Sequence, residues 1–364
     1  MLLASTISLT VIGLVMVLSA SSVSAYARFG SSFLFFRRQF VYALVGGAAL
    51  WFTSRMRYRA WDRLSAPLLA VSVVLLALVL HPAAGTVAGG SARWLAVGPI
   101  TVQPSEIAKL AVIAFASALL ARRWRELHDP GRLAMPLLPV AGAVCALIML
   151  QPDLGTTVIL AGAVFALLFV AGARLRHLFV GLVGSAAVGF ALIYVEGYRW
   201  SRLAAFLDPW ADPQGAGYQI IQSMIALASG GPLGVGLGAS RQKWLYVPNA
   251  HTDFIFSIIG EELGLAGNLA VVALFGTFIY AGIRIAMRAP DAFGRLMAAG
   301  ITAWIGLQAF VNLGAVTALL PITGVPLPFV SFGGSALVVS LAGVGVLVSI
   351  GRSSRAPRVT GRAS

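Results

Sequence analysis

The sequence has a single cysteine and few charged residues. Because Cys145 is alone, an intrachain disulfide and a thiolate metal cluster are both excluded. The four histidines, including His251, are scattered singly and lack metal-ligand spacing. Charged residues make up only 10% of the chain against 59% hydrophobic residues, and the mean hydropathy is +0.90. This composition excludes an ordinary soluble domain and predicts a polytopic membrane protein.

Acidic residues are scarcer than basic ones, with 12 against 26 and a net charge of +14. Such a charge can indicate nucleic-acid binding, but here the arginines occur in short clusters between apolar runs. That pattern is typical of the positive-inside rule, in which anionic lipid headgroups are the partners. The sequence therefore predicts a membrane, and no nucleic acid, as partner.

Ten apolar runs predict about ten membrane-spanning helices, since one span needs about 20 residues. The runs lie near residues 2–24, 40–53, 66–81, 104–121, 133–151, 156–171, 178–195, 254–283, 296–320 and 335–350. The SAYA sequence after the first run resembles a signal-peptide cleavage site, but no positive charge precedes the run, which favours an uncleaved span. With the N-terminus inside, 17 of the 26 basic residues are cytoplasmic.

These spans predict an all-α polytopic membrane protein. We expect one integral membrane domain over residues 1–351, with one large extracytoplasmic loop, about residues 196–253, between helices 7 and 8. Residues 352–364 are expected to form a disordered cytoplasmic tail.

Most carboxylates fall on the predicted outer side, where several flank or enter a span. A charge at the centre of a membrane helix costs roughly 2.5–3.5 kcal/mol, so such residues usually serve function. The outer face is therefore the predicted site of function. The eight residues are Glu106, Asp153, Glu196, Asp208, Asp212, Asp253, Glu261 and Glu262.

Asp253 lies in NAHTDFIFSIIG, where a polar loop becomes a helix. It, or Thr252, could cap the helix by accepting amide hydrogen bonds. Alternatively, partial burial at the membrane boundary raises its pKa and makes it a usable general base. Glu261 and Glu262 follow about two turns later, which predicts a position roughly 12–14 Å deeper in the membrane. A structural role in buried hydrogen bonds or ion pairs is favoured for both glutamates.

Glu106 and Lys109 are three residues apart in QPSEIAKL and would share one face of a helix. Lys109 either neutralises Glu106, or the pair lines a polar cavity that offers a cation to an anionic substrate. Arg93 could supply a cation from the preceding loop. Asp153 lies in the tight turn of LQPDLGTT and needs hydrogen-bond partners there.

The segment LLPITGVPLPFVSFGGS, residues 319–335, predicts a broken or re-entrant segment because prolines and glycines interrupt it. Ser331 and Ser335 could hydrogen-bond a ligand. No Ser-His-Asp order or GxSxG elbow accompanies them, which disfavours a serine nucleophile.

Together and in this order, these motifs resemble those of the SEDS family (shape, elongation, division and sporulation), over nearly the whole chain. Family members polymerise cell-wall glycan from lipid II at the outer face of the cytoplasmic membrane. FLDPWADP with GVGLGASRQKWLYVP is more similar to the division branch, acting at the septum, than to the elongation branch.

The resemblance implies a peptidoglycan glycosyltransferase in which the acceptor 4-hydroxyl attacks the donor anomeric carbon and undecaprenyl pyrophosphate leaves. It assigns Asp253 as the residue required for polymerisation. It also implies a class B penicillin-binding transpeptidase and other divisome membrane proteins as partners, with Mg²⁺ or Mn²⁺ as a possible helper. The candidate substrate-binding residues are Arg93, Glu106, Lys109, Asp153, Arg202, Lys243, His251, Ser331 and Ser335.

Three positions depart from the family pattern: Ala92, Leu245 and Asn249. Since Ala92 replaces an arginine, an anionic-substrate role for that loop rests on Arg93 alone. The residues alone leave two other functions open. One is a lipid II flippase, because buried charges and broken helices also occur in transporters. The other is a divisome scaffold that only activates a transpeptidase.

Overall fold

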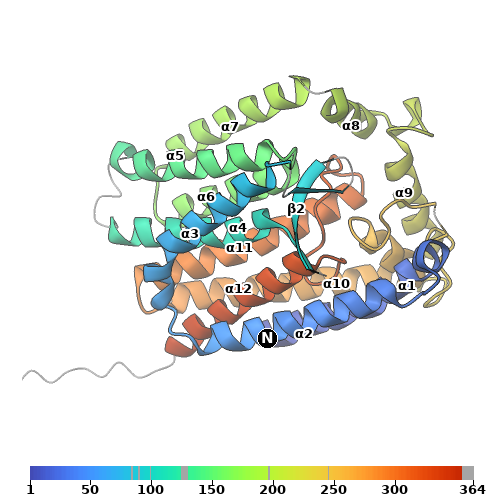
Figure 1. Cartoon of the computed structure of the whole chain (residues 1–364), viewed down its shortest axis with the longest axis horizontal. Helices are drawn as coiled ribbons and strands as arrows, with labels where there is room; N and C mark the ends of the chain where they lie inside the picture. The colour runs from blue at the N-terminus through green and yellow to red at the C-terminus, as the bar shows by residue number, and fades with distance from the viewer. Residues whose placement is uncertain are drawn as a thin grey trace, which may run out of the picture.

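The chain folds into one bundle of long helices, seen in a computed structural model (Figure 1). The model describes residues 1–82, 85–88, 91–98, 100–123, 130–195, 197–244 and 246–354. Ten of the described helices have 17 or more residues, which confirms the ten predicted spans. They are α1 (Leu2–Phe29), α2 (Leu34–Arg55), α3 (Ala60–Val79), α4 (Pro104–Arg122), α5 (Pro130–Met149), α6 (Leu154–Val170), α7 (Leu175–Val195), α10 (Ile255–Arg288), α11 (Ala292–Val316) and α12 (Gly334–Ser353).

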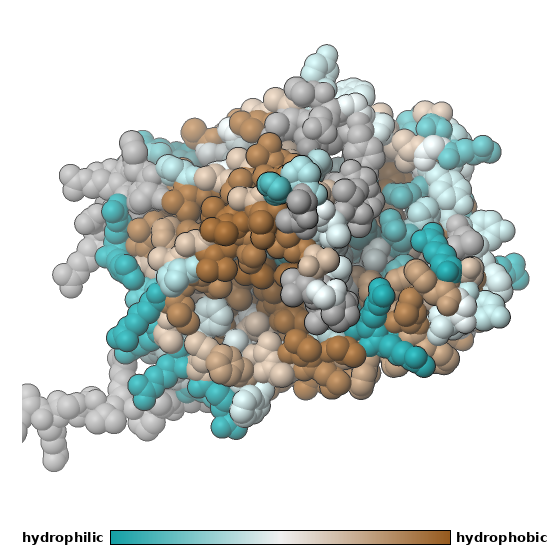
Figure 2. All heavy atoms as spheres, viewed as in Figure 1, coloured by the Kyte–Doolittle hydropathy of each residue, from teal (hydrophilic) through white to brown (hydrophobic). Residues whose placement is uncertain are grey.

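Six of these helices, α1, α3, α4, α10, α11 and α12, are long and apolar enough to cross a membrane, and α5–α7 contain shorter apolar helices. Side chains on the outside of the bundle are apolar as well: Val11, Leu44 and Phe179 are each more than half exposed. In Figure 2, brown hydrophobic side chains cover the middle of the visible face, and teal hydrophilic ones gather toward its ends. The protein is therefore a multi-pass membrane protein.

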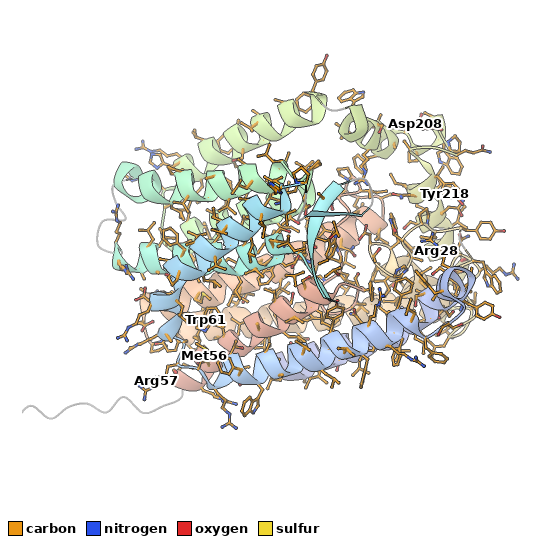
Figure 3. The ribbon with its side chains drawn as sticks, viewed as in Figure 1. Arg28, Met56, Arg57, Trp61, Asp208 and Tyr218 are labelled. Carbon is orange, nitrogen blue, oxygen red and sulfur yellow. The ribbon has the colours of Figure 1, made fainter. Side chains whose placement is uncertain are left out.

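The two ends of the bundle differ in chemistry (Figure 3). At the end near Met56 and Arg57, which we call the basic end, Arg59 pairs with Asp291 at 3.0 Å and Arg122 pairs with Asp62 at 2.9 Å. At the opposite end, which we call the loop end, lie α8 (Gly197–Leu207), the 3-10 turn η2 (Pro209–Ala211) and α9 (Tyr218–Gly230). These elements form the predicted large loop between the seventh and eighth long helices.

A small antiparallel sheet between α3 and α4 was not predicted. Its strands are β1 (Gly85–Ala88), β2 (Ser91–Val97) and β3 (Ile100–Val102), in the order β1-β2-β3. Leu95 of β2 pairs with Gly85 on one side and Val102 on the other. Such short strands give little periodicity in a glycine-rich loop, so the sequence did not distinguish them from irregular chain.

The segment assigned to α10 consists of two helices that meet at Gly264, where φ is 70° and ψ is −166°. The chain reverses there. The reversal is seen in the close approach of Gly260 and Asn268, which lie on either side of Gly264: a Cβ on Gly260 would lie only 2.5 Å from Nδ2 of Asn268. The first, short helix runs toward the loop end. Its Ser257 hydrogen-bonds Ser223, whose hydroxyl donates to the Val316 carbonyl at the loop end of α11.

Glu261 and Glu262 consequently lie farther toward the loop end than Asp253. Asp253 is level with Asn312, four residues before Val316 on α11, whereas the glutamates lie beyond Ser257. The prediction that they lie 12–14 Å deeper is wrong, because it assumed one continuous helix entering the membrane after Asp253.

Residues 352 and 353 were predicted to belong to a disordered tail but are helical, since α12 continues to Ser353. The remaining tail, residues 355–364, lies outside the described residues, as do Glu196 and Leu245.

We expect Gly264→Ala to destabilise the fold by about 2 kcal/mol or more. Its backbone conformation is one that essentially only glycine adopts, and a Cβ there would lie 2.3 Å from the amide nitrogen of Gly234. Thermal unfolding in detergent measures the effect. The matched control is Gly276→Ala in the same element, where nothing lies within 4 Å of a new Cβ. Equal melting temperatures for the two variants would contradict the reversal.

Candidate active site

Asp253 lies in a short non-helical segment, residues 251–254, that is held from two sides. Asn312 on α11 donates its side-chain amide to the Asp253 carbonyl at 2.8 Å. From the segment before α12, the Ser331 hydroxyl donates to the Thr252 carbonyl, and the Phe332 amide donates to the His251 carbonyl at 2.9 Å. These bonds fix the backbone that carries the carboxylate.

The Asp253 carboxylate does not cap the following helix. The N-cap residue is Phe254, and no side chain makes a capping hydrogen bond there. Thr252 uses its hydroxyl to donate to the Asn249 carbonyl. The helix-cap interpretation is therefore wrong for both residues, and the carboxylate is not engaged in holding α10.

Burial brings the pKa of the Asp253 carboxyl group into the range of a usable general base. It raises the pKa of Asp253 from 3.8 to about 6, while Arg202 and then Arg93 lower it, and Asp153 raises it slightly. Near neutral pH the group is mostly ionised yet can still take up a proton, which is the range favourable for general-base catalysis.

Gly324 separates Asp253 from Arg202. A Cβ built on Gly324 would lie 3.7 Å from Oδ2 of Asp253 and 3.9 Å from Nη1 of Arg202. Its φ of +70° is also one that other residues rarely adopt. The glycine therefore keeps a space open between a carboxylate and a guanidinium.

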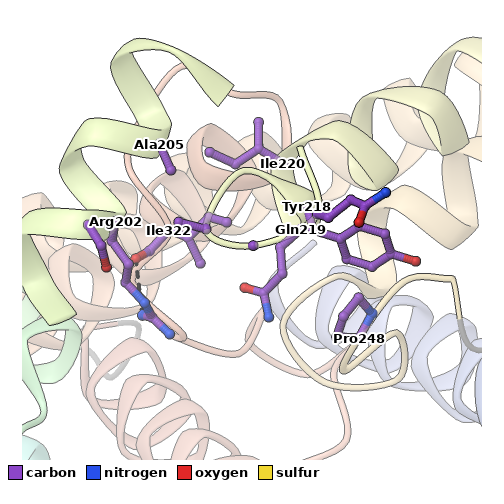
Figure 4. A pocket seen from close by; sticks show the side chains of 11 residues that line it. Arg202, Ala205, Tyr218, Gln219, Ile220, Pro248 and Ile322 are labelled. Carbon is purple, nitrogen blue, oxygen red and sulfur yellow. Dashed lines mark hydrogen bonds between the residues drawn. The ribbon is translucent and has the colours of Figure 1, made fainter. Parts of the chain in front are cut away.

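Arg202 projects from α8 and donates to the Ile322 carbonyl at 3.3 Å (Figure 4). Beside it is a pocket of about 260 Å³. The pocket is lined by polar and apolar side chains from α8, α9 and the adjoining loops. They include Ser201, Gln214, Tyr218, Gln219, Pro248 and Ile322.

Arg93 and Asp153 are held together at the sheet. Arg93 on β2 donates its Nε to the Gln151 carbonyl at 2.9 Å and its Nη2 to the Pro152 carbonyl. The Asp153 carboxylate caps α6 by accepting from the amide of Thr156 at 3.0 Å and from its hydroxyl at 2.8 Å. Asp153 thus has the partners that the sequence required, and its carboxylate is used structurally.

Glu106 and Lys109 form a buried ion pair of 2.8 Å, with side chains 3% and 1% exposed. The Lys109 ammonium also donates to Gln308 at 2.8 Å and lies 5.2 Å from the ring centroid of Trp304. Of the two interpretations offered for this pair, the structure supports neutralisation within the protein rather than the lining of an open cavity.

Lys243 is not brought to Asp253. Its ammonium, only 6% exposed, contacts the Glu262 carboxylate at 3.4 Å and the Gly238 carbonyl. Glu261 accepts hydrogen bonds from the Ser240 hydroxyl and from the Arg241 amide, the latter at 2.8 Å. The structural role predicted for the two glutamates is confirmed: they anchor the loop that precedes Asp253.

The side chains of His251, Ser331 and Ser335 pack against neighbouring residues or hold backbone segments in place. The His251 ring lies 4.5 Å from that of Phe35 and 5.6 Å from that of Phe332. Burial, assisted by Arg28, lowers the pKa of His251 to about 4, so the ring is neutral at pH 7. Ser331 holds Thr252, as described above, and the Ser335 hydroxyl accepts from the Gln103 amide at 3.0 Å.

Sequence reasoning missed Gln39, Gln308, Asn312 and Gly324. Gln39 donates to the Ser331 carbonyl at 3.1 Å and accepts from the Gly333 amide at 3.3 Å. Gln308 and Asn312 are four residues apart in an otherwise apolar run, and this spacing on one helix face was the available signal. Nothing comparable marked Gln39 or Gly324.

Within the described part of the chain, no three His, Cys, Asp or Glu side chains lie close enough together to hold a metal ion. Asp153, the carboxylate that acts on Asp253, already accepts hydrogen bonds from Thr156. The described residues therefore offer no cluster of three such ligands for Mg²⁺ or Mn²⁺, and no step below passes through a metal ion.

Comparison with known proteins agrees with this architecture. Residues 1–356 match the family model FTSW_RODA_SPOVE, described as cell cycle protein. The chain belongs to the FtsW/RodA/SpoVE family. It is 44% identical to the stage V sporulation protein E of Bacillus subtilis, over 96% of each chain. It is also 41% identical to the probable peptidoglycan glycosyltransferase FtsW of Geobacter metallireducens, covering 94% of this chain and 92% of that protein.

A solved structure extends the likeness to three dimensions. It is titled as the structural coordination of polymerization and crosslinking by a peptidoglycan synthase complex. One of its chains superposes on this protein with a TM-score of 0.78 at 31% identity, covering 98% of both. The family expectation from the motifs is thereby confirmed.

We expect Asp253→Asn to raise the melting temperature above pH 6. The folded-state pKa, about 6, lies above the ordinary value of 3.8, so ionisation disfavours the folded state as pH rises through that interval. Asparagine removes this cost, and the difference from wild type should vanish near pH 4. Thermal unfolding from pH 4 to 8 checks it, with the exposed-turn variant Asp212→Asn as control. A lower melting temperature for Asp253→Asn at pH 8 would contradict the burial argument.

Proposed function

We propose that this protein is a peptidoglycan glycosyltransferase that polymerises lipid II into glycan strands, with Asp253 as general base. One observation carries the proposal: a half-buried carboxylate, whose pKa is raised to about 6, and the Arg202 guanidinium both lie beside Gly324. The activity in the printed name of the FtsW relative supports the reaction class.

In the proposed reaction, the 4-hydroxyl of the acceptor saccharide attacks the anomeric carbon of the donor. As the new C–O bond forms, the hydroxyl proton passes to the Asp253 carboxylate. The bond between the anomeric carbon and the pyrophosphate oxygen breaks, and undecaprenyl pyrophosphate leaves with inversion at that carbon. A positioned base typically contributes 10²–10⁴-fold to such a step.

Arg202 and Arg93 supply positive charge where the leaving group gains negative charge. Both arginines lower the pKa of Asp253, and Arg202 lies beside Gly324 together with Asp253. The pocket beside Arg202 offers amide and hydroxyl groups from Gln214, Gln219 and Ser201, together with the Tyr218 ring. We assign it to a saccharide of the substrate.

The loop end faces outward in this proposal. The positive-inside rule places 17 of the 26 basic residues on the cytoplasmic side, which corresponds to the basic end. The protein then acts at the outer face of the cytoplasmic membrane, at the division septum if it follows its FtsW relatives. A class B penicillin-binding transpeptidase and other divisome membrane proteins are its proposed partners. The neighbour whose title couples polymerization with crosslinking supports the transpeptidase.

We expect Asp253→Asn to abolish polymerisation of lipid II by the purified protein, with a rate loss of about 10² or more. Electrophoresis of glycan products measures it. The control is Asp62→Asn at the basic end, which should stay within twofold of wild type. Polymerisation by Asp253→Asn at the wild-type rate would show that the base assignment is wrong. Scrambling of labelled lipid II in liposomes that Asp253→Asn leaves unchanged, without polymer formation by wild type, would favour a flippase.

We also expect polymerisation to rise with pH through about 6. The reaction needs ionised Asp253, whose pKa burial raises to about 6, so protonation at lower pH removes the base. Initial rates from pH 4.5 to 8 at saturating lipid II measure the profile. A rate that is flat down to pH 4.5 would exclude Asp253 as the titrating base.

A further inference from the structure

One face of α11 carries three polar side chains spaced four residues apart: Trp304, Gln308 and Asn312. All three are buried, with exposed fractions of 0%, 1% and 2%. The surrounding helix is apolar, and buried polar groups in such a setting are costly unless they are paired. Their partners therefore indicate what they do.

Asn312 joins two non-helical segments of the active site. Its Nδ2 donates to the Asp253 carbonyl at 2.8 Å and to the Val325 carbonyl at 2.8 Å. The first segment carries the proposed base. The second carries Gly324, which keeps the space between Asp253 and Arg202 open. One amide group thus sets the distance between the two segments.

Gln308, one turn earlier, continues the same contacts toward α4. Its Nε2 donates to the Pro326 carbonyl at 3.0 Å. Its Oε1 accepts from the Lys109 ammonium at 2.8 Å and from the Trp304 indole N–H at 3.0 Å. Hydrogen bonds therefore connect Glu106 and Lys109 with the segment that Asn312 also holds.

The orientation of both amides follows from their partners. The Lys109 ammonium and the Trp304 indole can only donate, so they require the oxygen of Gln308. The carbonyls of Asp253 and Val325 can only accept, so they require the nitrogen of Asn312. Both amides therefore donate to the same segment, Gln308 to the Pro326 carbonyl and Asn312 to the Val325 carbonyl, and Asn312 also donates to Asp253.

Asn312 is kept at a cost in stability. Its Oδ1 is buried and has no hydrogen-bond partner among the described residues. A buried acceptor without a partner destabilises the folded state. A residue retained only for packing would be better replaced by an apolar one of similar size, so this cost points to function.

We propose that Gln308 and Asn312 are positioning residues, through which the buried Glu106–Lys109 pair holds Asp253 and Gly324 in the geometry needed for glycosyl transfer. The expected effect on glycosyl transfer rests on the proposed function. Through these contacts an enclosed ion pair acts on the backbone that carries Asp253 without touching substrate. Neither amide contacts the reacting atoms.

The test uses near-isosteric variants of the full-length protein, Asn312→Leu and Gln308→Met, which remove the hydrogen bonds and keep the volume. The matched control is Thr302→Val on the same helix. It removes a buried hydrogen bond that stays within α11, from the Thr302 hydroxyl to the Ala298 carbonyl. Melting temperatures establish that each variant is folded before kinetics on lipid II.

Both variants should lose kcat by about 10²-fold, the effect expected of a misplacement near 1 Å, with KM within about threefold. Thr302→Val should keep wild-type kcat. A folded Asn312→Leu protein with kcat within twofold of wild type would overturn the proposal. If Asn312→Leu does not fold, Gln308→Met, which leaves Asn312 intact, decides by the same criterion.

The double variant Lys109→Met/Gln308→Met tests the connection itself. If the two side chains act through one path, the kcat of the double variant equals that of the less active single variant. Losses that multiply would show that Lys109 does not act through Gln308, and would overturn the coupling.

A second readout does not depend on activity. Infrared titration of the Asp253 carboxyl, identified by its absence in Asp253→Asn, should show a different midpoint in Asn312→Leu and an unchanged one in Thr302→Val. An unchanged midpoint in Asn312→Leu would overturn positioning. Absence of polymer with wild type would instead count against the proposed function, while the titration still decides the role of Asn312.

Discussion

Asp253 is a half-buried carboxylate on irregular backbone. Such a backbone must be held from several sides, and the rest of this structure depends on how this is done. Peptide groups inside an apolar bundle must find partners within the protein. Here they come from α11 through Asn312 and from the segment before α12 through Ser331 and Phe332. The main chain is satisfied in this way and the carboxylate does not cap the helix, so the proposed reaction can use it as the base.

The charges around this segment divide into two kinds. Glu106–Lys109 and Glu262–Lys243 are enclosed pairs that hold elements together. Arg202 and Arg93 act on Asp253 across space and oppose the effect of burial on its pKa. The result is an acid that is neither permanently neutral nor fixed in an ion pair, beside cations suited to a pyrophosphate leaving group. In the proposed reaction, burial raises the pKa of the base and the two arginines supply positive charge.

The sequence predicted the number of spans well, because hydropathy is a strong local signal. Its charge pattern also singled out Asp253, the base of the proposed reaction. It also predicted the Glu106–Lys109 pair, since i,i+3 spacing fixes a shared helix face. It failed at Gly264, because hydropathy reports whether a residue is apolar but not which way the chain runs. Pairings across long separations, such as Ser331 with Thr252, leave no local pattern at all. Gln308 and Asn312 did leave a local signal in their four-residue spacing, but that spacing does not show which segments the two amides hold.

The most direct measurement is a structure of the protein with a non-reactive lipid II analogue in the donor site and lipid II as acceptor. The account predicts the pyrophosphate beside Arg202 and Arg93, the acceptor 4-hydroxyl within about 2.6–3.2 Å of Asp253, and a saccharide in the pocket next to Gln219. Substrates bound at the basic end, or an acceptor hydroxyl out of reach of Asp253 with a different base beside it, would contradict the account.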